Sequence, residues 1–130
     1  MADELAWPIE IIPDGNSVFM RAHKAHFRDG VLQPGVFREQ DGGMSVDWDK
    51  YGSAETTRQQ APKPADNGVI SMPVAGIRHI EGLKVEHTPE PLNRAHAEVF
   101  GLGLTDRERQ TEMRLLLLGI SQILIPLSDL

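Results

Sequence analysis

The chain has 130 residues, a formal net charge of −6 and no cysteine. Its length is typical of one domain, and 40% hydrophobic with 25% charged residues fits a globular protein rather than a disordered or fibrous one. The lack of cysteine excludes disulfide scaffolds, thiol nucleophiles, thiolate zinc sites and iron–sulfur clusters. Coating of DNA or RNA needs clustered Lys and Arg, so an acidic chain argues against a nucleic-acid partner. We expect a single globular domain over residues 1–130.

Targeting and membrane signals are also missing from the sequence. The N-terminus is acidic and carries no apolar run of the kind that a secretory signal needs. The most apolar stretch, residues 115–127, is shorter than the roughly 20 residues that span a bilayer. We therefore expect a cytoplasmic protein without a membrane partner.

The first quarter of the chain predicts one strand and a helical turn. Residues 7–12 are apolar but lie between Pro8 and Pro13, which favours an edge strand or an extended arm. Apolar and polar residues alternate over 17–22, which predicts a strand that turns into a helical turn ending at Gly30. The same stretch also fits one face of an amphipathic helix.

The next segment predicts a hairpin and a short helix. Residues 36–37 and 44–48 are expected to be short strands around an Asp41-Gly42-Gly43 turn. Ser53 is a typical N-cap, so a helix is expected over 54–60.

Prolines and a closing Asn-Gly make residues 59–68 a loop. Strands are then expected over 68–74 and 83–88, with a helical turn at 75–80 between them.

Two further helices are expected near the end of the chain. The first covers 92–100 and ends at Gly101. The pattern Thr105-Asp-Arg-Glu is a capping box that begins a long helix, whose apolar spacing continues to Leu127. The alternative makes 112–118 a buried strand. Short strands mixed with helices predict an α+β fold, in which a small, mostly antiparallel sheet packs with three or four helices.

The densest polar feature is a basic segment at residues 21–28. Arginine presents a planar fork to oxyanions, so this segment is predicted to bind an anionic small molecule or an acidic protein surface. The alternative is a solvated face whose cations neutralise nearby carboxylates. The ligand-binding candidates in this segment are Arg21, His23, Lys24, His26 and Arg28.

The spacing of His23 and His26 is one that zinc ligands use on a helix. No HExxH pattern and no cysteine support such a site, so we expect no metal and no cofactor.

A second polar group follows in the predicted strand 44–48. Alternation places Ser45, Asp47 and Asp49 on one face, beside Tyr51. This face is able to order a ligand hydroxyl, which makes Ser45 and Tyr51 further ligand-binding candidates. The alternative is a sheet face turned to water, with Trp48 in the core.

Whether the protein is an enzyme is left undecided by the sequence. On the predicted helix 92–100, Arg94 and Glu98 are neighbours that form a helix-stabilising pair. Glu98 with His96 is also suited to act as a general base and a proton relay. The candidates for catalytic residues are His23, Asp47 and Glu98.

The order of these polar residues resembles the order of roles in ADP-ribosyltransferase folds. The early strand carries Arg21 and His23, the middle strand leads to Tyr51, and Glu98 or Glu112 stands in the place of the late glutamate. The resemblance implies nucleotide-dependent group transfer as an alternative to simple binding.

A third alternative is a structural protein that forms oligomers. We expect that a small domain does not bury all the apolar side chains of residues 115–127. A helix face that stays uncovered commonly pairs with a partner or with a second copy of the chain. A homo-oligomer is therefore also predicted as a possible assembly.

Overall fold

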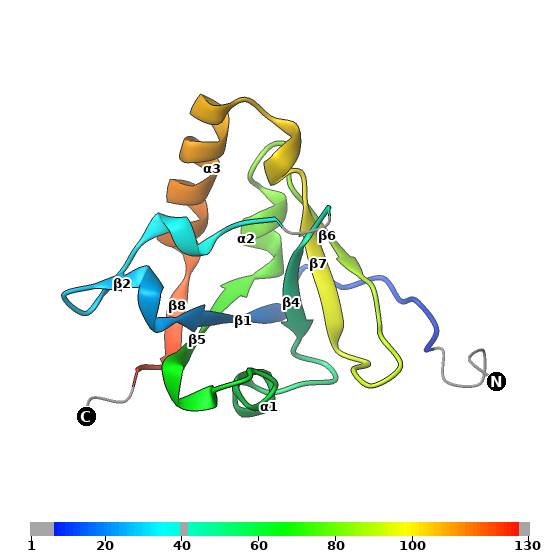
Figure 1. Ribbon diagram of the computed structural model, residues 1–130. Coiled ribbons are helices and arrows are strands. Elements are labelled where there is room, and N and C mark those ends of the chain that lie inside the picture. Colours follow the sequence, from blue (N-terminus) through cyan, green and yellow to red (C-terminus); the bar gives the residue numbers. More distant parts are fainter. Residues whose placement is uncertain (1–6, 40–41, 128–130) are drawn as a thin grey trace.

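The computed structural model describes residues 7–39 and 42–127. Its centre is a six-stranded sheet in the order β6-β7-β4-β1-β5-β8, and every pairing in it is antiparallel (Figure 1). The strands are β1 (Ser17–His23), β4 (Met44–Trp48), β5 (Asn67–Pro73), β6 (Lys84–His87), β7 (His96–Phe100) and β8 (Gln122–Ile125).

Three α-helices pack with this sheet in the described part of the chain: α1 (Ala54–Gln59), α2 (Val74–Arg78) and α3 (Arg107–Ile120). The α+β class and the mostly antiparallel sheet are therefore confirmed, with three α-helices where three or four were expected. Four 3-10 turns are found within residues 7–39 and 42–127: η2 (Lys24–His26), η3 (Pro34–Val36), η4 (Pro64–Asp66) and η5 (Leu102–Leu104). None of the described helices has the length and apolar character needed to cross a bilayer.

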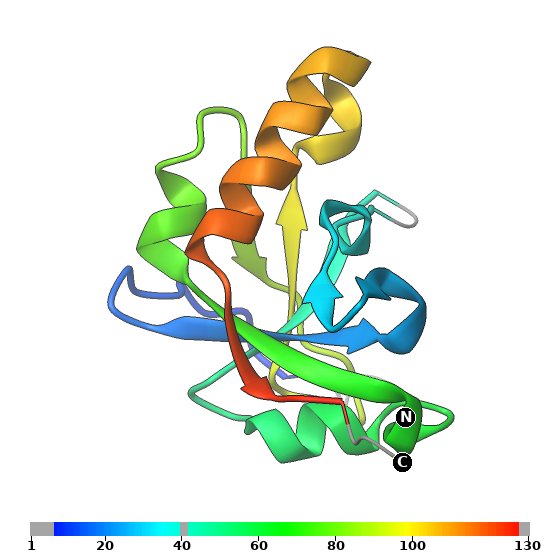
Figure 2. The same ribbon diagram turned by 90° about the vertical axis from the view of Figure 1, so that its left-hand side faces the viewer.

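One face of the sheet carries the hydrophobic core. Along β1, Val18, Met20 and Ala22 are buried, while their neighbours on the strand point to the opposite face. Helices α2 and α3 cover the core face, where Met113 and Leu117 are fully buried (Figure 2). The alternation that predicts β1 thus also separates an apolar face from a polar one.

The polar face is covered in part by α1. Ser53 caps this helix as predicted, because its side chain accepts a hydrogen bond from the backbone N–H of Thr56 at 3.1 Å. Thr57 of α1 is buried and donates to Asp47 of β4. The helix is therefore attached to the polar face by a hydrogen bond to the sheet.

Strands β1 and β4 pair only at Val18–Trp48 and Phe19–Asp47, although both strands continue beyond these positions. Figure 1 shows β4 turning away from β1 at this point. On its other side, β1 pairs with β5 along its whole length. A gap therefore opens between β1 and β4 inside the sheet.

The expected helix over 92–100 is wrong. This segment contains a tight turn, with Glu90 bridged to Asn93, followed by strand β7. Ala97 and Val99 point into the core while His96 and Glu98 point to the polar face. Buried and polar side chains thus alternate as they do in a strand, and not with the spacing of a helix. The helical pair of Arg94 with Glu98 does not form.

The expected hairpin of 36–37 with 44–48 is also wrong. Pro34 begins the 3-10 turn η3, and only 44–48 forms a strand. The helical turn before Gly30 ends early, at His26. Asp29 and Gly30 have positive φ and form the tight turn of a small hairpin of β2 (Phe27–Arg28) and β3 (Val31–Leu32).

The C-terminal helix forms, and the alternative strand at 112–118 does not. Its N-cap is Asp106, which accepts from the backbone N–H of Arg109 at 2.8 Å, rather than the expected Thr105. It ends at Ile120 instead of Leu127, because the chain beyond Ser121 pairs with β5 as β8 (Figure 2).

Several large apolar side chains near the end of the described chain are exposed. They lie on α3 and on the edge strand β8: Leu115, Leu116, Ile123 and Leu124. Self-association through this surface stays a prediction.

Candidate functional site

A pocket of about 440 Å³ lies on the polar face of the sheet, where β1 and β4 part. It reaches down to Met20, Met44 and Val46 of the core, because the two strands no longer pair there. Its polar lining includes Arg21, His23, His26, Arg38, Ser45, Asp47 and His96. Five of these seven residues are among the site candidates of the sequence. Arg38 is added by the fold, and His96, which the sequence suggested only as a partner of Glu98, is placed in the pocket by β7.

One wall of the pocket is basic. Arg21 and His23 extend from β1, His26 follows on η2, and Arg38 comes from the segment after η3. The guanidinium of Arg21 donates to the backbone carbonyl of Thr57 at 3.2 Å, so α1 holds this side chain in place. Strand β1, the turn η2 and the segment after η3 thus place two guanidinium groups and two imidazoles along one wall of the pocket.

The two histidines of this wall are in defined environments. His23 Nδ1 accepts from the backbone N–H of Ala25 at 3.0 Å, which leaves Nε2 as the proton donor of the neutral ring. Burial lowers the pKa of His26, and the like charges of Arg38 and His23 lower it further. The cationic form of His26 is therefore disfavoured as long as no anion is present beside it.

Asp47 is the buried carboxylate of the pocket. Its Oδ2 accepts from Thr57 Oγ1 at 2.7 Å, and its Oδ1 accepts from Asn93 Nδ2 at 2.8 Å. Both oxygens of Asp47 thus accept hydrogen bonds from neutral side chains and are not paired with the basic wall. Asp47 therefore orders α1 and the turn before β7 around the pocket.

Ser45 and His96 meet on the opposite wall. Ser45 Oγ lies 3.3 Å from His96 Nε2, and both side chains line the pocket. His96 Nδ1 lies 2.8 Å from the backbone carbonyl of Thr88, which fixes the orientation of the ring. The sequence places His96 on a helix beside Glu98, whereas the fold places it on β7 beside Ser45.

Three further candidates of the sequence, two basic residues and one glutamate, do not line the pocket. Lys24 forms an ion pair with Asp66 at 3.3 Å and is largely exposed. Arg28 lies on the exposed β2–β3 hairpin and does not line the pocket. Glu98 packs over Gly43 and is also outside the lining.

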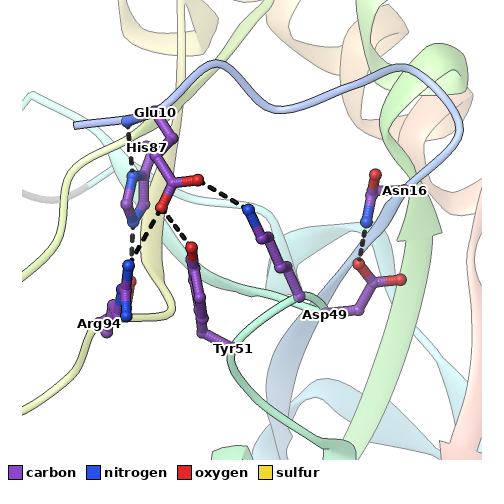
Figure 3. Close-up of polar contacts among 7 residues, drawn as sticks. Glu10, Asn16, Asp49, Tyr51, His87 and Arg94 are labelled. Atoms are coloured by element: carbon purple, nitrogen blue, oxygen red, sulfur yellow. Dashed lines mark hydrogen bonds and ion pairs between the residues drawn. The ribbon is translucent and has the colours of Figure 1, made fainter. Parts of the chain in front are cut away.

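Tyr51 belongs to a separate group of residues that anchors the extended arm of residues 7–12 (Figure 3). We call Glu10, Lys50, Tyr51, His87 and Arg94 the arm cluster. Glu10 accepts from Lys50 Nζ at 2.8 Å and from the Tyr51 hydroxyl, and its carboxylate lies 3.6 Å from the Arg94 guanidinium. The hydrogen bond from Lys50, followed by that from Tyr51, holds the pKa of Glu10 below its usual value.

The arm is also held through its backbone. The N–H of Glu10 donates to Nδ1 of the buried His87 at 3.0 Å, and His87 Nε2 donates to the carbonyl of Arg94 at 2.7 Å. The Arg94 guanidinium stacks over the ring of Tyr51. Tyr51 is thus a structural residue of the arm cluster, at a distance from the pocket lining.

Several pocket residues were missed by sequence reasoning. Thr57, Asn93 and Arg38 carry no local motif, and they reach the pocket through contacts between elements far apart in the chain. Within residues 7–39 and 42–127, no three His, Asp or Glu side chains are grouped so that they could hold a metal ion.

Comparisons with protein-family models, with curated proteins and with solved structures find no match to this chain.

Proposed function

We propose that the pocket between β1 and β4 binds a small anionic ligand whose recognised group is an oxyanion, either a phosphate or a carboxylate. The observation that carries this proposal is that Arg21, His23, His26 and Arg38 line one pocket. Arginine and imidazolium donors are the side chains that proteins use most directly for such groups.

The charges around the pocket support this proposal. Asp47 is already engaged by Thr57 and Asn93, and the other acidic side chain of the lining is the exposed Glu90. Among the described residues, neither Arg21 nor Arg38 has a carboxylate within ion-pair distance. An incoming anion would therefore find donors that no carboxylate of residues 7–39 and 42–127 pairs with.

The shape of the site favours a small molecule over an acidic protein surface. A pocket of about 440 Å³ is of the size that encloses a small ligand. The residues best placed to meet a flat partner are Lys24 and Arg28, but Lys24 is paired with Asp66 and Arg28 is on a separate hairpin.

Group transfer from a nucleotide is less well supported by the geometry. Arg21, His23 and Ser45 line the pocket, but Tyr51 is in the arm cluster. Of the two late glutamates, Glu98 packs over Gly43 and Glu112 pairs with Arg109 on α3. Group transfer stays a prediction, and incubation with NAD tests it by product formation.

Titration of the labelled protein with inorganic phosphate and with succinate, followed by amide NMR, tests the binding proposal. We expect saturable shifts at the amides of Arg21, His26 and Arg38, because these residues line the pocket. Arg21→Gln should weaken binding about tenfold, which corresponds to about 1.4 kcal/mol, whereas Arg28→Gln should leave it unchanged. Absence of saturable shifts with both anions would contradict the proposal.

A further inference from the structure

Ser45 and His96 are brought together by the pairing of β4 with β7. The register sets Asp47 opposite His96 and Ser45 opposite Glu98, so all four side chains lie on the polar face. Ser45 and His96 are thus diagonal neighbours, and the Oγ–Nε2 distance is 3.3 Å. Neither residue contributes to the hydrophobic core.

The hydrogen bonds of His96 determine which of its nitrogens is basic. His96 Nδ1 lies 2.8 Å from the backbone carbonyl oxygen of Thr88 and 3.1 Å from the Thr88 hydroxyl. Because a carbonyl only accepts, the tautomer that suits the shorter contact carries its proton on Nδ1 and donates it to Thr88 O. In the neutral ring Nε2 then carries the lone pair, and it accepts from the Ser45 hydroxyl. This is the arrangement in which an imidazole activates a serine: hydroxyl to Nε2, and Nδ1–H to a fixed acceptor.

The pair is placed where a substrate is able to reach it. Ser45 is exposed, His96 is half-buried, and both line the pocket that also contains Arg21. A guanidinium is a donor of the kind that stabilises the oxyanion of an acyl-transfer intermediate. The pocket thus combines a nucleophile, a base and a cationic donor.

We propose that Ser45 is a nucleophile activated by His96, and that the pocket hydrolyses small carboxylic esters. Ser45 Oγ attacks the ester carbonyl while its proton moves to His96 Nε2. The bond from the carbonyl carbon to the alcohol oxygen breaks, and the alcohol leaves with that proton. Water then attacks the acyl carbonyl carbon and gives a proton to His96 Nε2. The bond from the carbonyl carbon to Ser45 Oγ breaks, Oγ takes that proton back from His96, and the carboxylic acid leaves.

This inference goes beyond anion binding, and its test uses an uncharged probe so that the result does not depend on anion binding. The protein is incubated with a neutral alkyl fluorophosphonate, which reacts with activated serines by loss of fluoride, and the product is followed by intact mass. We expect one phosphonyl group per chain, located on Ser45 by peptide mass spectrometry.

Matched variants identify the residues that react. Ser45→Ala, at an exposed position, should abolish labelling, and Ser71→Ala, on the same sheet face without a histidine partner, should leave it unchanged. His96→Gln should slow labelling at least about 100-fold, the usual contribution of a general base. Lack of labelling of the wild-type chain, or labelling that persists in Ser45→Ala, would overturn the proposal. The phosphate titration of the same sample reports separately on anion binding.

Discussion

Thr57 of α1 donates a 2.7 Å hydrogen bond to the buried carboxylate of Asp47 on β4. This bond joins the helix to the polar face of the sheet, beside the pocket. Thr57→Val keeps the shape of the side chain but removes the donor, so Asp47 loses one of its two side-chain partners. We expect the free energy of unfolding to fall by about 1.5–3 kcal/mol.

Urea denaturation measures this loss. The control is Thr111→Val on the exposed surface of α3, which should change the free energy of unfolding by less than about 0.5 kcal/mol. Equal effects of the two variants would show that the Asp47 bond makes no special contribution.

His26 should titrate below the usual range of histidine. Burial lowers its pKa most, followed by the charges of Arg38 and His23. As the pH falls through about 6.5, the unfolded chain takes up this proton before the folded chain does, so the free energy of unfolding decreases. NMR titration of the imidazole should give a midpoint below 6.5, and Arg38→Gln should raise it. Arg28→Gln is the control, since Arg28 is outside the pocket and should leave the midpoint unchanged.

Attachment of the arm should weaken in acid. The pKa of Glu10 is lowered by its hydrogen bonds to Lys50 and Tyr51, so the ionised form favours the attached arm. This contribution is complete above the usual value of 4.5 and disappears as the pH falls through the lower pKa of the folded state. Hydrogen exchange at the Glu10 amide, which is bonded to His87, should accelerate over that range. In Glu10→Gln the acceleration should be present already at neutral pH; exchange that is unchanged in the variant would contradict this role.

Two glycines should respond in opposite directions to the same substitution. Gly101 has φ +115°, and a Cβ there would collide with the backbone carbonyl of Gly82. Gly101→Ala should therefore cost at least about 2 kcal/mol. Gly119 lies within α3 with open space around it, so Gly119→Ala should stabilise by about 0.5–1 kcal/mol. Thermal unfolding compares the two variants under one set of conditions.

The parts of the fold that depend on local patterns were predicted from the sequence. Alternation identified β1 and β4, and the Ser53 cap identified α1. The errors are in segments whose structure is decided by distant partners. β7 contains an alanine and a glutamate that suit a helix, but it pairs with β4 and β6. Likewise β8 continues an apolar helical pattern, but it pairs with the free edge of β5.

The same distinction applies to the candidate site. Arg21, His23 and His26 are close in sequence and come from one strand and its following turn, so their grouping was visible before the fold was known. The position of His96 beside Ser45 depends on the β4–β7 register, which no local pattern specifies. Arg28 and Lys24 were included because they are adjacent in sequence, but the turn after β1 directs them away.

The short ladder between β1 and β4 divides the sheet into two halves of three strands each. Two residue pairs join these halves, whereas seven pairs join β1 to β5. We expect the two halves to move relative to each other most easily at this junction, and such motion would widen or narrow the space between them. A ligand bound between the two halves would restrict this motion. Its binding would therefore reduce the internal fluctuation of the sheet, in addition to forming contacts with the surrounding side chains.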